Sequence, residues 1–208
     1  KEGNQKYKFA DKRLGNIANI DASNPLNILI YFSDFNVVKI LDNTLAEIKQ
    51  ISLNDYFIGA EKICMSNDNN FWIHDKQSMK FLKINHSGEI LFETNVLNDI
   101  GLADFLPIKI KEKDNLFFAL GEEKLLVFDN FGQLNKIILV KEALDFQYGN
   151  NKILILSKNN VEMVTMDLVE SFKVPMPKVF NQELAKSIKL ETDRWYFLYE
   201  QGIDWIKR

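Results

Sequence analysis

Histidine and carboxylate side chains occur together in one stretch of the sequence, SNDNNFWIHDKQSMKFLKINHSGEILFE, residues 66–93. This stretch contains both histidines of the chain, His74 and His86, with Asp75 and Glu89 close by. Histidine and carboxylate side chains are zinc ligands, and a well-placed histidine can act as a general base. The first question is whether the stretch forms a metal or acid–base site, or is one copy of a structural repeat.

The elements around these residues follow a repeating pattern of strands. Short runs rich in β-branched and aromatic residues are bounded by Asn, Asp, Gly and Lys, which predicts strands and turns. Five stretches share one form, an apolar strand, a polar turn and a second strand: NILIYFSDFNVVKILDN, NFWIHDKQSMKFLKINH, NLFFALGEEKLLVFDN, KILILSKNNVEMVTMD and RWYFLYEQGIDWIKR. The first strands are anchored at Ile28, Phe71, Leu116, Ile153 and Trp195, which are 43, 45, 37 and 42 residues apart. A period near 40 residues made only of strands is typical of propeller blades.

The remainder of each period supplies two more strands, one before the hairpin and one after it. We therefore predict an all-β fold, a five-bladed β-propeller with four-stranded blades, forming a single domain over residues 1–208. The fifth unit ends after its third strand, and KYKFA, Lys6–Ala10, is predicted to supply the missing one, so that the N-terminal strand closes the last blade. An open β-sandwich is the alternative, but it predicts neither a regular period nor a terminal unit lacking one strand.

The predicted strands separate the two histidines. His74 ends the second strand of its blade, and His86 lies in the turn NHSG beyond the opposite end of the third strand. At roughly 3.3 Å per strand residue the two rings would lie about 20 Å apart. Zinc ligands must converge within about 2 Å of one ion, so this is not a metal site. We expect His74 to be a half-exposed strand residue without an activating partner.

Other catalytic patterns are weak. Glycine is scarce, with nine residues, and no pair has the spacing of a phosphate-binding loop. A five-bladed propeller can be a glycosidase with paired carboxylates on its inner strands. The acidic candidates are Asp21, Asp104, Asp145 and Glu191, whose positions near strand ends favour capping or turn formation. The prediction is no catalytic residue, no cofactor and no metal ligand.

Composition excludes several function classes. A net charge of −3 over 208 residues argues against nucleic acid as a partner, because such surfaces cluster Lys and Arg. No apolar stretch approaches the roughly 20 residues of a membrane-spanning helix, which leaves peripheral association with the cell envelope open. The single cysteine, Cys64, lies in the apolar run KICM and is expected to be a buried thiol.

The first predicted blade resembles a group of uncharacterised exported proteins of Bacteroidetes. The resemblance lies in LGNIANIDASNPLNILIYFSDFNVVKILDNTLAEI, residues 14–48, and it fades into a general propeller pattern afterwards. The stretch NNFWIHD is similar to a strand of the NHL and periplasmic sensor propellers. The resemblance implies periplasmic or outer-membrane localisation, with the targeting segment outside these 208 residues, and it assigns no functional residue.

Two classes of function follow. The first is a non-enzymatic protein-interaction propeller, an accessory or scaffold subunit of a cell-envelope assembly. The alternative is a propeller that binds a glycan or small molecule, or hydrolyses it, at the mouth of the central channel. Short connections and the lack of converging polar residues favour the first. We predict a protein partner on the blade end that carries the second-to-third-strand turns and the connections between blades, with these candidate residues: Phe35, Tyr56, Phe57, Ile100 and Phe180.

Overall fold

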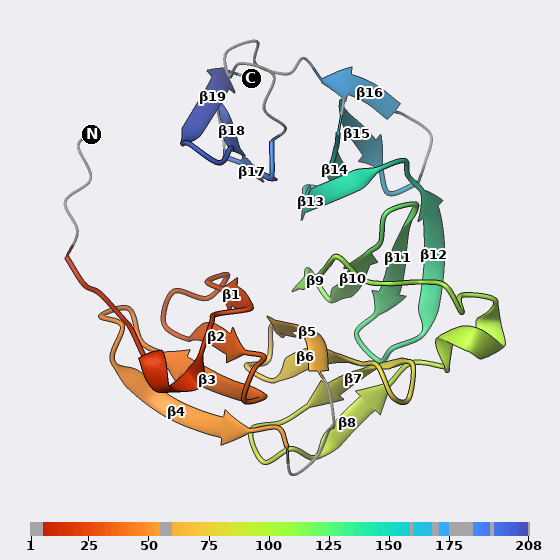
Figure 1. The fold of residues 1–208 in the computed structure, drawn as a ribbon. Coiled ribbons are helices and arrows are strands. Elements are labelled where there is room, and N and C mark those ends of the chain that lie inside the picture. Colours follow the sequence, from red (N-terminus) through yellow and green to blue (C-terminus); the bar gives the residue numbers. More distant parts are fainter. Residues whose placement is uncertain are drawn as a thin grey trace. The chain divides into compact units, whose positions relative to one another are not determined.

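The fold consists almost entirely of β-strands (Figure 1). The computed structural model describes residues 6–54, 60–158, 160–167, 171–174, 185–191 and 194–207. In these residues the only helices are two short 3₁₀ turns, η1 (Lys12–Leu14) and η2 (Leu97–Ile100). No helix in the described residues is long and apolar enough to cross a membrane.

The first two sheets have four strands each, in the order of the sequence. Neighbouring strands in both sheets pair antiparallel. The first sheet consists of β1 (Asn19–Asp21), β2 (Ile28–Phe32), β3 (Val37–Leu41) and β4 (Glu47–Ser52). The second consists of β5 (Ala60–Met65), β6 (Phe71–Asp75), β7 (Lys80–Ile84) and β8 (Ile90–Glu93).

Three more sheets repeat this order of strands. The third consists of β9 (Lys109–Lys113), β10 (Leu116–Leu120), β11 (Lys124–Asp129) and β12 (Leu134–Leu139). The fourth consists of β13 (Ala143–Gly149), β14 (Lys152–Ser157), β15 (Val161–Thr165) and β16 (Ser171–Val174). The described part of the fifth consists of β17 (Ser187–Leu190), β18 (Arg194–Leu198) and β19 (Ile203–Lys207). Five such sheets confirm the predicted fold class, a five-bladed β-propeller.

Asparagines in the left-handed backbone region form several of the tight turns. Asn69, Asn115, Asn150 and Asn151 have φ between 52° and 65° in the turns that join the first and second strands of three sheets. Asparagine tolerates this region better than most side chains. These turns explain why asparagine positions predict where the second strand of each of these three sheets begins.

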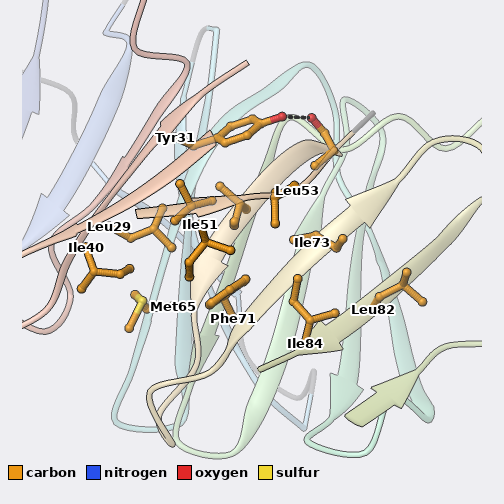
Figure 2. Packing of buried hydrophobic residues seen from close by; sticks show 13 residues of the cluster. Leu29, Tyr31, Ile40, Ile51, Leu53, Met65, Phe71, Ile73, Leu82 and Ile84 are labelled. Carbon is orange, nitrogen blue, oxygen red and sulfur yellow. Dashed lines mark hydrogen bonds between the residues drawn. The ribbon is translucent and has the colours of Figure 1, made fainter. Parts of the chain in front are cut away.

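The residues form two compact units. The first contains Lys1–Phe105, Ile110–Phe117 and Phe128–Asn135, and the second contains Leu106–Lys109, Phe118–Val127 and Lys136–Arg208. Each unit has its own core. In the first unit, 13 buried residues of the first two sheets pack together, among them Leu29 and Ile40 from one sheet and Ile73 and Leu82 from the other (Figure 2).

The N-terminal segment differs from the prediction, because Lys6–Ala10 forms no strand. Phe9 packs instead on the first sheet, against the buried cluster of Ile30, Phe32 and Leu41. The neighbouring Asp11 accepts a hydrogen bond from the buried amine of Lys39 at 2.8 Å. These two contacts hold the segment on the face of the first sheet. No fourth strand pairs with β19 among the described residues.

Candidate functional site

The candidate site lies at one end of the first two sheets. Because the strands are antiparallel, the β2–β3 turn and the last residue of β4 share one end, and so do the β6–β7 turn and the last residue of β8. A hydrogen bond from the Tyr31 hydroxyl to the carbonyl oxygen of Ala60, at 2.6 Å, joins these ends of the two sheets (Figure 2). We call this end the turn surface. It comprises residues 33–36, Asn54, residues 76–79 and η2.

Phe35 stands at the tip of the β2–β3 turn. Its side chain is 50 % exposed, whereas Phe32 at the end of β2 is buried. The amide of Asn54 donates to the backbone carbonyl of Phe35 at 3.1 Å. The backbone that carries this ring is therefore fixed, while the ring itself faces solvent.

A buried network holds the rest of the turn. The Tyr31 hydroxyl lies 2.8 Å from Oδ1 of Asn36, a residue that adopts φ 51°. The Leu53 amide donates to the carbonyl oxygen of Asn36 at 2.9 Å. Burial raises the pKa of Tyr31 to about 12, so the hydroxyl keeps its proton over the whole physiological range. These contacts fix the conformation of the turn in the free protein.

Asp34 fixes the same turn from the N-terminal side. Its carboxylate accepts from the backbone amide of Asn16 at 3.3 Å. Gly15 adopts φ 73°, and a Cβ there would lie only 2.2 Å from Oδ2 of Asp34. Only glycine permits this approach, which places the N-terminal segment beside the turn that carries Phe35.

The other predicted contact residues have different outcomes. Ile100 ends η2, and its side chain is partly buried rather than free. The Leu97 amide at the start of η2 donates to the carbonyl oxygen of Met79 at 2.9 Å, which anchors η2 to the β6–β7 turn. Tyr56, Phe57 and Phe180 lie outside the described residues. The structure therefore brings Phe35 and Ile100 to the same surface, and binding by all five residues stays a prediction.

His74 differs from the sequence expectation, because it is completely buried. Its ring packs 5.0 Å from the Phe81 ring, centroid to centroid, on the face of β6 that also carries Trp72. It also has a partner that spacing did not reveal, since Nδ1 lies 3.3 Å from Oε2 of Glu61. That carboxylate is also paired with Lys76 at 3.0 Å. The alignment of Nδ1 with Glu61 does not meet hydrogen-bond geometry, so His74 is a desolvated imidazole beside an ion pair.

This burial predicts a pH dependence of stability. Burial lowers the pKa of His74, and the negative charge of Glu61 only partly opposes that effect. The unfolded chain, with a histidine pKa near 6.5, then binds a proton more readily than the folded chain. The free energy of unfolding therefore has its full value above about pH 6.5. It decreases as the pH falls from there toward the pKa of His74 in the folded protein. Urea titrations between about pH 7.5 and 5.5 should show this loss, and His74→Leu should flatten it.

The partly exposed His86 provides the matched control for this experiment. His86→Asn should leave the pH dependence of unfolding as in the parent protein. An equal slope in the parent and in His74→Leu would contradict the assignment to His74.

His86 lies in a turn, as predicted. Its Nε2 lies 2.6 Å from the carbonyl oxygen of Asn69, and its ring meets Phe71 edge-on at 5.6 Å. The turn is closed by Gly88, whose φ is 79°. In the part of the chain that the structure describes, His, Cys, Asp and Glu do not gather into any group of three or more suited to a metal ion.

Two of the four acidic candidates for glycoside hydrolysis connect neighbouring sheets, the partly buried Asp21 and the buried Asp145. Asp21 on β1 accepts from the Met65 amide on β5 at 2.9 Å. Asp145 on β13 accepts from the Ile188 amide on β17 at 2.9 Å, and also pairs with Ser187 and Lys109. Carboxylates saturated by such donors hold sheets together and are poor candidates for proton transfer to a substrate.

The other two acidic candidates, Asp104 and Glu191, lie at the surface. Asp104 lies exposed in the turn before β9. Glu191 follows β17 and pairs with Lys189 at 2.9 Å on the surface. Among the described residues, the four candidates thus form no catalytic pair.

Sequence reasoning missed a highly connected buried acid, Glu112 on β9. Its carboxylate accepts from Trp72 Nε1 at 2.6 Å, from the Ser66 hydroxyl at 2.7 Å and from the Asn67 amide at 3.1 Å. The buried amine of Lys83 lies 3.5 Å away. Glu112 lies between lysines in KIKEKD, a run of mixed charge that is typical of a solvated edge. The signal that could have found it is its place two residues after the apolar Ile110, which puts both side chains on the same face of a strand.

Cys64 is a buried thiol, as predicted, at 1 % exposure. Burial raises the pKa of the thiol well above its ordinary value, and the negative charges of Asp21 and Glu112 act in the same direction. A protonated, inaccessible thiol is a poor nucleophile. Cys64 therefore belongs to the core of the first unit.

The comparisons with known proteins establish the fold class. No protein-family model matches the chain, and no curated protein sequence matches it. Among solved structures, the extracellular domain of the putative hybrid two-component system BT4673 of B. thetaiotaomicron matches with TM-score 0.65 and 14 % identity over 90 % of this chain and 27 % of that one. PorZ, a surface component of the type-IX secretion system of Porphyromonas gingivalis, matches with TM-score 0.66 and 12 % identity over 92 % and 26 %.

An enzyme also shares the fold. The streptogramin B lyase structure matches with TM-score 0.62 and 15 % identity, over 90 % of this chain and 67 % of the lyase. This chain spans only about a quarter of the length of the first two proteins. At such low identity these likenesses show the fold alone: the chain is a β-propeller. The sequence resemblance to uncharacterised exported proteins stays a prediction.

Proposed function

We propose that this chain is a non-enzymatic protein-interaction propeller, an accessory or scaffold subunit of a cell-envelope assembly, exported to the periplasm or outer membrane. The observation that supports it best is Phe35, a half-exposed aromatic ring on a turn held by the Tyr31–Asn36 network. Rigid aromatic anchors bind partners at low entropic cost. The proposal includes one propeller domain over residues 1–208.

Two similar structures support the location. The similar structure from BT4673 is an extracellular domain, and PorZ is a surface component of a secretion system. Both come from Bacteroidetes, the group suggested by the first predicted blade. The proposed partner is a protein that contacts the turn surface, with Phe35 as the anchor and Ile100 beside η2. Tyr56, Phe57 and Phe180 remain proposed contacts.

Replacement of Phe35 tests the proposal. Phe35→Ser should weaken partner binding by at least about 2 kcal/mol, near thirtyfold in Kd, because the anchor is lost. The melting temperature should barely change, because the ring is half exposed and the turn is held by other residues. The measurement is quantitative capture from cell-envelope extract on the immobilised protein, followed by the affinity of the captured protein.

Phe131→Ser is the matched control. Phe131 is 55 % exposed and lies in the β11–β12 turn, at the other end of its sheet. The control should capture the partner as well as the parent does. If Phe35→Ser also captures it fully, the partner binds elsewhere. If only a glycan array gives a signal, the alternative class of function replaces this one.

A further inference from the structure

A small cavity lies between the fourth and fifth sheets. Its volume is about 30 Å³, roughly the share that one water molecule takes in the liquid. Leu154 on β14 and Met163 on β15 contribute apolar lining, and both belong to the apolar cluster in which the two sheets pack. All of the lining residues lie in the range 136–208 of the second compact unit, so the cavity is a property of that unit alone.

The indole of Trp195 on β18 lines this cavity without an acceptor. Trp195 is 8 % exposed, and its Nε1 is buried with no hydrogen-bond partner in the part of the chain that the structure describes. An indole N–H can only donate. A buried donor without an acceptor destabilises the folded state, and nearly all such groups in proteins have a partner. An acceptor bound in the cavity would supply one.

The fourth sheet brings a positive charge to the same cavity. Lys152 begins β14 and lies opposite Gly149 across the β13–β14 pairing, as Leu154 lies opposite Gln147. Residues opposite each other, or two apart along a strand, share a face, so these four residues face the fifth sheet together. The amine of Lys152 pairs with no carboxylate among the described residues, and no Asp or Glu lines the cavity.

The donors and the volume together define the ligand. The lining offers the ammonium of Lys152, the indole N–H of Trp195 and the side-chain amides of Gln147 and Asn150. A cation would meet no opposite charge there, whereas an anion would accept from Trp195 and balance Lys152. Sulfate, phosphate and carboxylate groups are too large for a cavity of one water molecule's size. The chemistry is therefore that of a single monatomic anion.

We propose that this cavity is a halide site, occupied by chloride under ordinary conditions. Nε1 of Trp195 donates to the ion from the fifth sheet, and Lys152 supplies the opposite charge from the fourth. Leu154 and Met163 exclude water from its apolar side. The bound ion thereby links β14 to β18 and stabilises the packing of the two sheets.

Thermal melting tests the site when chloride replaces gluconate at constant ionic strength. The melting temperature of the parent chain should rise with chloride and level off as the site fills, because a ligand that binds only the folded state stabilises it. Trp195→Phe keeps an aromatic ring and removes the donor. This variant should raise the chloride Kd at least about tenfold, since a hydrogen bond to a charged acceptor is lost.

Two further variants act on the cavity without touching Trp195. A Cβ at Gly149 would meet no atom within 4 Å, so Gly149→Val should fill the space and abolish the chloride dependence. Lys152→Met removes the charge and should also raise the chloride Kd. Lys158→Met is the matched control, because Lys158 follows the opposite end of β14 and pairs with Glu142 at 3.1 Å. It should respond to chloride as the parent does.

Bromide gives the position of the ion. Crystals of the 208-residue chain grown in sodium bromide should show an anomalous peak beside Nε1 of Trp195. Circular dichroism confirms that each variant is folded. A parent chain that melts at the same temperature in chloride and gluconate overturns the proposal, even if crystals hold bromide, because that is binding at crystal concentration only. So does a chloride effect that persists unchanged in both Trp195→Phe and Gly149→Val, or a bromide peak found only elsewhere.

Discussion

Glu112→Ala is expected to lower the free energy of unfolding by about 3–5 kcal/mol, as the loss of one partner from a buried charged network does. The substitution removes the acceptor of the Trp72 indole, the Ser66 hydroxyl and the Asn67 amide. It also removes one of the two carboxylates near the amine of Lys83, a residue that is 3 % exposed. The measurement is urea unfolding followed by tryptophan fluorescence, to which Trp72 contributes together with Trp195 and Trp205.

The remaining partner of Lys83 limits the loss. Asp68 lies 2.9 Å from the amine, and its pKa is lowered to about 2 because the hydrogen bonds from Lys83 and from the Asn70 amide outweigh the opposing effect of burial. Glu93→Ala is the matched control, since Glu93 is half exposed and pairs with Lys80 at the surface. Surface pairs contribute at most about 1 kcal/mol. A Glu112→Ala protein as stable as Glu93→Ala would contradict the connecting role.

Phe81→Ala is expected to destabilise the protein by a similar amount, about 3–5 kcal/mol, because a large cavity replaces a fully buried ring. Phe81 on β7 has 0 % exposure, and its ring meets those of Phe105, Phe117 and Phe128 at centroid distances of 5.2–6.4 Å. These edge-on contacts add to the burial of apolar surface. Urea unfolding gives the measurement.

Phe92→Ala on the neighbouring strand β8 is the control for the same residue type. Phe92 is 36 % exposed, and its ring meets that of Phe131, which is itself exposed. We expect its loss to cost less than about 1.5 kcal/mol. If Phe81→Ala fell in that range as well, the aromatic cluster would not be the core of this part of the first unit.

The hairpins of the blades were predictable from the sequence because their signals are local. Each pairs two adjacent apolar runs across a short polar turn, and the second and third strands of all five sheets are found where the pattern places them. The period of the repeat then determines the number of blades. Neither step needs any knowledge of contacts between sheets.

Contacts between sheets were not predictable. The role of Glu112 on β9 depends on Trp72 on β6, 40 residues earlier. The burial of His74 against Phe81 could not be predicted either, although both residues lie in the second sheet. The N-terminal segment presents the same difficulty: KYKFA has the composition of a strand, yet Phe9 packs on Phe32 at 6.5 Å between ring centroids. Side-chain packing overrode the strand propensity of these residues.

The candidate site was predicted in part. Phe35 lacked an evident strand partner in the sequence, and it is exposed on a turn. Nothing in its neighbourhood revealed that Tyr31, an apparent core residue, also fixes the turn through Asn36. Ile100 reaches the same surface through η2, a short helical turn that strand patterns do not indicate.

The hydrogen bonds between sheets bear on how the chain folds while it is being synthesised. Asn19 reaches Ile63, Asp21 reaches Met65, Ser66 reaches Glu112 and Asp145 reaches Ile188, over separations of 44, 44, 46 and 43 residues. Since the entropy of loop closure depends only on the logarithm of loop length, each of these closures costs nearly the same. A nascent chain can therefore add one sheet after each further 45 or so residues, without waiting for its C-terminus, as repeat proteins do. Ribosome-bound chains ending near residues 105 and 149 should already protect the Asp21–Met65 contact from hydrogen exchange.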